Sequence, residues 1–182
     1  MAHRLLILFS SLLALTFAQS TLYSAFPLFT QSRLGLSARD VGFLYMLMAL
    51  VAIGVQGYLI RILLKRFDVK TLFSCGTWLM LFGIGLIPVS PSVTWLIVFL
   101  LLMSFGGSLN VPVLQGLISN AATPERLGHV MGQAQAFSSL GRMIGPLWGG
   151  FFYSLSPELS FTTTALILLL MLIMAMPSIA KK

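Results

Sequence analysis

Long runs of apolar residues alternate with short polar connections along almost the whole chain. A membrane-spanning helix needs about 20 mostly apolar residues, and six segments meet this requirement. They are residues 5–29, 41–61, 71–89, 93–118, 127–153 and 160–178. Backbone groups in hydrocarbon must find hydrogen bonds within their own segment, so runs of this length predict helices rather than strands. The pattern therefore predicts an all-α, polytopic membrane protein, with residues 1–182 forming one bundle of six transmembrane helices.

The composition leads to the same class of protein. Of the 182 residues, 58% are hydrophobic and only 8% are charged, whereas soluble domains carry about 25% charged residues. So few charges exclude an ordinary soluble enzyme and a disordered chain, and a single cysteine, Cys75, excludes a disulfide scaffold. The net charge is +7. Because the basic residues lie between apolar runs, they favour a lipid bilayer over a nucleic acid as the partner.

The basic residues also indicate an orientation, because cytoplasmic loops are enriched in Lys and Arg. If the chain starts inside, only Arg33 and Arg39 fall outside, and eight basic residues fall in the cytoplasm. The eight are Arg4, Arg61, Lys65, Arg66, Lys70, Arg126, Lys181 and Lys182. We therefore expect both termini to be cytoplasmic and the bundle to lie in the plasma (inner) membrane. A secretory signal in residues 1–18 is the alternative for the N-terminus, but the apolar character resumes at Leu22, which favours a span.

The fifth segment carries a regular pattern of glycines, G-x8-G-x3-G-P-x2-G-G. Its members are Gly132, Gly141, Gly145, Pro146, Gly149 and Gly150. Gly141, Gly145 and Gly149 are four residues apart, so they line one helical stripe on which another helix can pack closely. Gly128 and Gly132 begin a similar stripe one region earlier. The simplest interpretation is a small-residue packing face.

This spacing resembles the antiporter motif of the major facilitator superfamily, found in its drug–proton antiporter branch. The surroundings are similar too: residues 33–42 look like the family's outer loop, in which Ser37 can cap the next helix with Asp40 as its reciprocal partner. Residues 123–128 resemble its short cytoplasmic turn. The resemblance covers the whole chain and implies one half of a twelve-helix fold built from two related halves.

A second family motif helps to choose the half. The cytoplasmic loop of the first half reads roughly G-x-L-x-D-R-x-G-R-R, and the residues at the corresponding positions here include Gly57, Leu59, Arg61, Lys65 and Arg66. Arg61 stands where the aspartate belongs and Leu64 replaces the second glycine. This decay is typical of the second half, although the glycine pattern is best known from the first. We therefore expect the C-terminal half, with an N-terminal six-helix half as its partner.

Polar residues inside the predicted helices are the candidates for the lining of a transport cavity. They are Gln19, Tyr23, Gln56, Asn110, Gln115, Gln135 and Arg142. Gln19 and Tyr23 are four apart and share a helix face. The resemblance implies that the first and fourth helices line the central cavity. The competing interpretation is structural, because lone amides in membrane helices often bond neighbouring helices.

Arg142 lies about 22 Å along its predicted helix, counted at 1.5 Å per residue. A central arginine costs about 2.5–3.5 kcal/mol on insertion scales, so it should face the bundle interior or a wet cavity. Two interpretations of Arg142 remain: it contacts a substrate, or it is a structural hydrogen-bonding hub. None of the four Asp and Glu residues lies inside a predicted helix. The acid on which the family's proton coupling usually relies would then belong to the other half.

Together these features predict half of a secondary transporter that moves a small molecule, drug-like efflux substrates included, by alternating access. The resemblance implies a coupling ion, with the proton favoured. The alternative is a six-helix membrane scaffold without transport activity of its own. No enzymatic activity, cofactor or nucleic acid is expected, since nucleotide-binding and hydrolase motifs are missing. His3 and His129 lie far from any second ligand, so no metal site is expected.

Overall fold

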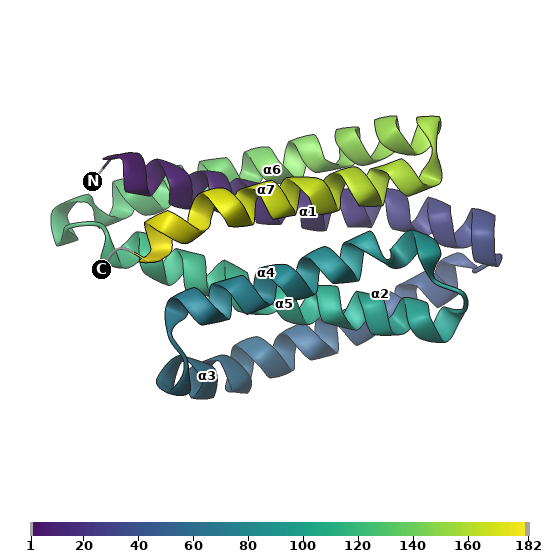
Figure 1. Cartoon of the computed structure of the whole chain (residues 1–182), viewed down its shortest axis with the longest axis horizontal. Coiled ribbons are helices and arrows are strands. Elements are labelled where there is room, and N and C mark those ends of the chain that lie inside the picture. The colour runs from purple at the N-terminus through teal and green to yellow at the C-terminus, as the bar shows by residue number, and fades with distance from the viewer. Residues whose placement is uncertain (1, 181–182) are drawn as a thin grey trace.

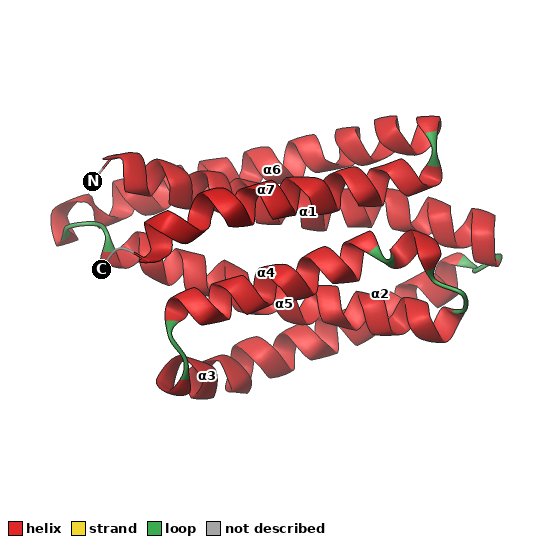
Figure 2. Cartoon of the chain, viewed as in Figure 1, coloured by secondary structure: helices red, strands yellow, loops and turns green. Residues whose placement is uncertain are grey.

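The computed structural model describes residues 2–180, and these residues are almost entirely helical (Figures 1 and 2). The helices are α1 (Ala2–Leu34), α2 (Ala38–Gly54), α3 (Ile60–Arg66), α4 (Val69–Gly85), α5 (Val93–Asn120), α6 (Leu127–Leu155) and α7 (Pro157–Ala180). A π-helical turn, η1 (Val55–Leu59), joins α2 directly to α3. Two 3-10 turns, η2 (Ile87–Val89) and η3 (Pro124–Arg126), lie in connections. No strand occurs among residues 2–180, and the predicted all-α class is confirmed.

Because α2, η1 and α3 form one continuous path, the chain makes six antiparallel passes. Four segments are long and apolar enough to cross a membrane: Arg4–Leu34, Ala38–Arg66, Val93–Asn120 and Pro157–Pro177. The other two predicted spans are weaker. α4 is apolar but has only 17 residues, and α6 has 29 residues but is diluted by glycine, glutamine and serine.

The ends of most helices extend beyond their predicted bounds. The segment predicted at 5–29 is part of the helix Ala2–Leu34, and the one predicted at 41–61 is part of Ala38–Arg66. The alternative interpretation of the N-terminus is a secretory signal in residues 1–18. Residues 2–18 lie within α1, and Ala18 is fully buried in the core. The extra turns include polar and charged residues such as Gln31, Arg33 and Lys65, which lower the local hydropathy.

The two ends of the bundle differ in charge. The start of α1, the α3–α4 and α5–α6 connections and the end of α7 lie together at one end (Figure 1). Among the described residues, these segments carry Arg4, Arg61, Lys65, Arg66, Lys70 and Arg126. At the opposite end, Arg33 of α1 forms an ion pair with Glu158 of α7. Lys181 and Lys182, which the sequence assigns to the basic end, lie outside the described residues.

The corner between α1 and α2 is built by local backbone chemistry. Gly35 follows the last residue of α1 with φ +65°, a left-handed conformation that suits glycine. The N–H of Leu36 donates to the carbonyl of Thr30 at 3.2 Å, which closes the helix end. Ser37 then caps α2 in a capping box: its hydroxyl accepts from the N–H of Asp40, and the Asp40 carboxylate accepts from the N–H of Ser37. The predicted cap is confirmed.

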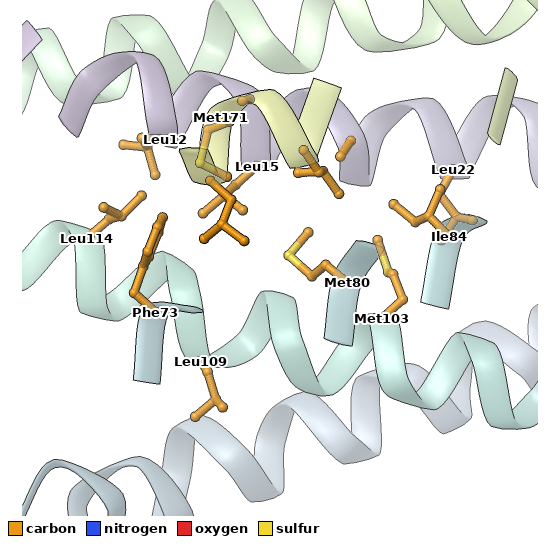
Figure 3. Close-up of a cluster of buried hydrophobic side chains, with 14 of the residues drawn as sticks. Leu12, Leu15, Leu22, Phe73, Met80, Ile84, Met103, Leu109, Leu114 and Met171 are labelled. Carbon is orange, nitrogen blue, oxygen red and sulfur yellow. The ribbon is translucent and has the colours of Figure 1, made fainter. Parts of the chain in front are cut away.

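The hydrophobic core lies between α1, α4, α5 and α7. Figure 3 shows Leu12, Leu15 and Leu22 of α1 directed toward side chains of α4 and α5. On those helices Phe73 and Leu114 are fully buried. By contrast, only 17% of the apolar window of Ala38–Arg66 is buried. The second pass thus packs on one side only and leaves apolar side chains such as Ile53 outside the bundle.

The glycine stripe of α6 lies directly on α1. A Cβ atom on Gly145 would lie 2.7 Å from the carbonyl oxygen of Phe17, and one on Gly149 would lie 3.1 Å from that of Thr21. A Cβ on Gly141 would lie 2.5 Å from the carbonyl oxygen of Leu13 and 3.0 Å from the backbone nitrogen of Phe17. The close approach lets the hydroxyl of Thr21 donate to the carbonyl of Gly145 at 3.1 Å. The predicted packing face is confirmed for these three glycines.

The earlier stripe of Gly128 and Gly132 does not pack against another helix among residues 2–180. No described residue lies within 4 Å of a Cβ built on Gly128 or Gly132, and the same holds for Gly150. The physical reason is helical phase. Gly132 lies nine residues before Gly141, about 180° around the helix at 100° per residue, so it is turned away from α1.

A second small-residue seam, which was not predicted from the sequence, joins α4 and α5. A Cβ on Gly83 would lie 2.6 Å from the backbone nitrogen of Met103, and one on Gly106 would lie 2.9 Å from that of Met80. Gly76 packs against Gly106 and Asn110. The sequence feature that could have indicated this seam is the spacing of Gly76, Met80 and Gly83 by four and three residues, which places them on one helix face.

Candidate functional site

A cavity of about 290 Å³ lies between α1, α5 and the second pass formed by α2 and η1. It is lined by Gln19, Tyr23, Tyr45, Met48, Ala49, Ala52, Gln56, Met103, Ser104, Gly107, Ser108 and Val111. Half of this lining carries amide, hydroxyl or phenol groups, and none of it is charged. Tyr23 is 55% exposed, so the cavity opens at the surface of the bundle.

Three irregularities of the helices meet at this cavity. Pro27 in α1 has no N–H for the carbonyl of Tyr23, and Pro112 in α5 has none for the carbonyl of Ser108. Gln56 lies in the π turn η1, where the backbone pattern changes again. Irregular backbone at membrane depth is tolerated where it lines a cavity.

The polar groups of the cavity are held by specific contacts. The hydroxyl of Ser104 donates to the carbonyl of Met48 at 2.7 Å, which ties α5 to α2. The hydroxyl of Tyr45 lies 3.5 Å from the carbonyl of Tyr23 that Pro27 leaves unpaired. The two tyrosine rings meet edge to face, with centroids 5.3 Å apart. The cavity therefore offers rigid aromatic edges beside hydrogen-bonding groups.

Gly107 makes room for the longest polar side chain of the site. A Cβ atom at this position would lie 2.5 Å from the Nε2 atom of Gln19, so the Gln19 amide lies against the bare backbone of α5. The arrangement suits a small molecule that combines an aromatic or apolar body with a few uncharged polar groups.

The structure brings together three of the seven candidates from the sequence, Gln19, Tyr23 and Gln56. It adds Tyr45, Ser104 and Ser108, which sequence reasoning missed. The available signal was the spacing of Ser104 and Ser108, four apart on the face of α5 that the cavity uses. Gln115 is exposed toward the end of α5, and Gln135 and Arg142 lie on the exposed face of α6. None of these last three lines the cavity.

Asn110 lies in the α4–α5 seam rather than at the cavity. It is fully buried, and its amide faces Phe73 and Thr77 of α4. With its oxygen toward Thr77, the amide accepts from the N–H of Thr77 at 2.9 Å and donates to the carbonyl of Phe73 at 3.1 Å. All of these partners belong to the neighbouring helix. In this bundle Asn110 therefore bonds a neighbouring helix, which is the structural alternative to lining the cavity.

The basic loop motif begins directly after the cavity residue Gln56 and runs into α3. Gly57 lies in the π turn and Leu59 ends it, whereas Arg61, Lys65 and Arg66 follow on α3. The three basic side chains are exposed. The structure thus places this motif on the surface, beyond the cavity and next to the α3–α4 connection.

A larger groove of about 360 Å³ between α1 and α7 differs in chemistry. Apart from Ser10 and Ser11, its lining is entirely apolar. Both serine hydroxyls donate to carbonyls of their own helix, Leu6 and Ile7. The groove therefore offers no free polar group that would select a ligand.

Comparisons with known proteins give a family match and sequence relatives. Residues 8–181 match the family model described as Major Facilitator Superfamily. Over 85 residues, 47% of this chain, the sequence is 34% identical to the multidrug resistance protein B homolog of Mycobacterium tuberculosis, in strains CDC 1551 / Oshkosh and H37Rv. That alignment covers 16% of the relative's length.

A solved structure matches in fold. The crystal structure of the human organic anion transporter MFSD10 (TETRAN) superposes with a TM-score of 0.79 at 24% identity. The match covers 94% of this chain and 40% of that chain. Nearly all of the six-pass bundle is therefore found within a larger helical protein.

Proposed function

The chain belongs to the major facilitator superfamily, a family of membrane transporters, and from this we propose that it forms the C-terminal half of a secondary active transporter. The predicted polytopic membrane bundle is confirmed by the fold match. Two halves would rock about a site at the midplane, so that the site opens to each side in turn. The 40% coverage of the solved transporter supports a partner bundle of similar size. The decayed loop motif favours the C-terminal half.

The α1–α2–α5 cavity is the proposed contribution of this half to the substrate site. The observation that carries this proposal is the meeting of Pro27, Pro112 and the π turn at one polar cavity that opens at the bundle surface. The substrate class that fits is a small amphipathic molecule, held by aromatic edges and uncharged hydrogen-bonding groups. The multidrug resistance relative supports an efflux substrate.

Ion coupling would rest on the other half. The four acidic residues are Asp40, Asp68, Glu125 and Glu158. Each lies in a connection or within the first turn of a helix. A group that takes up and releases a proton at membrane depth is therefore supplied from outside this chain, and the proton remains the coupling ion favoured by family resemblance.

Filling the cavity tests the proposed substrate site. Ala49→Trp adds a large ring inside the lining, and we expect at least a fivefold loss of energy-dependent ethidium efflux from cells that express the whole transporter. Leu50→Trp is the matched control, because Leu50 is the next residue, is 56% exposed and does not line the cavity. It should keep most of the activity at equal membrane abundance. Equal efflux by both variants would exclude the cavity, and absence of efflux in the parent would favour the scaffold alternative.

The proposed orientation places both termini in the cytoplasm, on the evidence of the basic end of the bundle. In a Cys75→Ser background, Ser92→Cys and Pro157→Cys should react with an impermeant thiol reagent added to intact cells. Asp68→Cys and Thr123→Cys should react only after the membrane is opened. The reverse labelling pattern would overturn the orientation.

A further inference from the structure

Arg142 lies at the middle depth of the bundle. It follows Gly141 and precedes Gly145, and both glycines pack against α1 close to Phe17. Phe17 is near the midpoint of the apolar segment Arg4–Leu34, which is long enough to cross a membrane. The depth of Arg142 is therefore fixed by α1 and does not depend on the hydropathy of α6 itself.

Among residues 2–180, the guanidinium of Arg142 has no charged partner. Its Nη2 lies 3.5 Å from the hydroxyl of Ser139, a long contact within the same helix. Among the described residues the one ion pair joins Arg33 to Glu158 at the end of the bundle. All four acidic residues lie at helix ends or in connections, far from the middle of α6. The side chain of Arg142 is exposed on the surface of the bundle, where a ligand or another helix can contact it.

The residues around Arg142 form a polar face. Gln135, Ser139, Arg142 and Pro146 are spaced by four, three and four residues, so they share one side of α6. All four are exposed. The face lies about 100° around the helix from Gly141, because successive residues are rotated by that angle. It therefore flanks α1 without being covered by it, and presents an amide and a hydroxyl beside the guanidinium.

We propose that this face of α6 is a carboxylate-binding site, with Arg142 as the charged group and Ser139 and Gln135 as neighbouring donors. The planar fork of arginine matches a carboxylate with two parallel hydrogen bonds. One guanidinium balances one negative charge, whereas a phosphate dianion would leave net charge at membrane depth. The carboxylate comes either from an organic anion or from an Asp or Glu on an adjacent membrane helix. This site is separate from the α1–α2–α5 cavity and does not require that cavity to bind substrate.

The first arm of the test uses a small carboxylate. The full 182-residue chain is reconstituted in phosphatidylcholine nanodiscs, and side-chain arginine NMR resonances are followed during titration with benzoate. The Arg142 resonance, assigned by its loss in Arg142→Lys, should shift and saturate, whereas benzamide should leave it in place. The resonance of Arg126, exposed in the α5–α6 connection, serves as the internal control and should not saturate.

The second arm uses a carboxylate carried by a helix. A transmembrane leucine–alanine peptide with one central Glu, or Gln as the control, is tested for energy transfer to a dye on the exposed Cys75. The Glu peptide should associate at least fivefold more strongly than the Gln peptide. Arg142→Gln should remove this difference, Arg142→Lys should keep part of it, and Arg126→Gln should leave it unchanged.

The two arms separate the sources of the carboxylate. Saturable benzoate binding alone assigns the site to an organic anion, and selective association of the Glu peptide alone assigns it to a neighbouring helix. Both responses support a site that accepts either. If the parent chain shows neither response, or if Arg142→Gln keeps the Glu-peptide preference, the proposal is overturned.

Discussion

Gly145→Leu is expected to separate α6 from α1 and to leave little folded protein. A Cβ atom at this position would lie 2.7 Å from the carbonyl oxygen of Phe17 and 3.0 Å from the backbone nitrogen of Thr21. These are backbone atoms, so no change of rotamer relieves the clash and the helices must move apart. Overpacking at the upper end of the usual range costs about 3 kcal/mol, or about 100-fold in the folding equilibrium.

Size-exclusion chromatography in mild detergent measures this effect as the fraction of protein in the monodisperse peak. We expect less than a tenth of the parent's value for Gly145→Leu, together with a lower thermal unfolding midpoint. Gly150→Leu is the matched control in the same helix, because nothing lies within 4 Å of its Cβ position. It should behave as the parent does. If the two variants are equally stable, the glycine stripe is not a packing interface.

The helices and one of their interfaces were predictable because each depends on a repeating pattern. Apolar runs of about 20 residues indicate the six passes, and glycines four apart indicate the face of α6 that lies on α1. The cap at Ser37 followed from its spacing to Asp40, since the box needs a carboxylate three residues after the cap. These features are local, so the sequence alone contains them.

The parts of the candidate site that could not be predicted depend on contacts between distant segments. The π turn at Gln56 is one extra residue in a helical turn, which no apolar period reveals. Asn110 and Gln19 are both lone amides in apolar helices, yet one is bonded into the α4–α5 seam and the other lines the cavity. The rotation of each helix about its own axis, α1 for Gln19 and α5 for Asn110, separates these two outcomes. Neither composition nor spacing fixes that rotation.

Alternating access is the central claim of this account, and it predicts that one residue of the cavity meets water from both sides of the membrane. Ala52 lines the cavity on the second pass, and a small side chain there tolerates cysteine without filling the space. The only native cysteine, Cys75, is exposed on α4 and is replaced by serine, so the reporter is then unique.

The decisive measurement is the labelling of Ala52→Cys in the assembled transporter by an impermeant thiol reagent, in right-side-out and in inside-out vesicles. We expect labelling in both preparations, with the balance between them shifted by an imposed proton gradient. Ser92→Cys, in the α4–α5 connection, is the control and should react only in right-side-out vesicles. Labelling of Ala52→Cys from one side alone, unchanged by the gradient, would contradict alternating access and leave a static membrane scaffold.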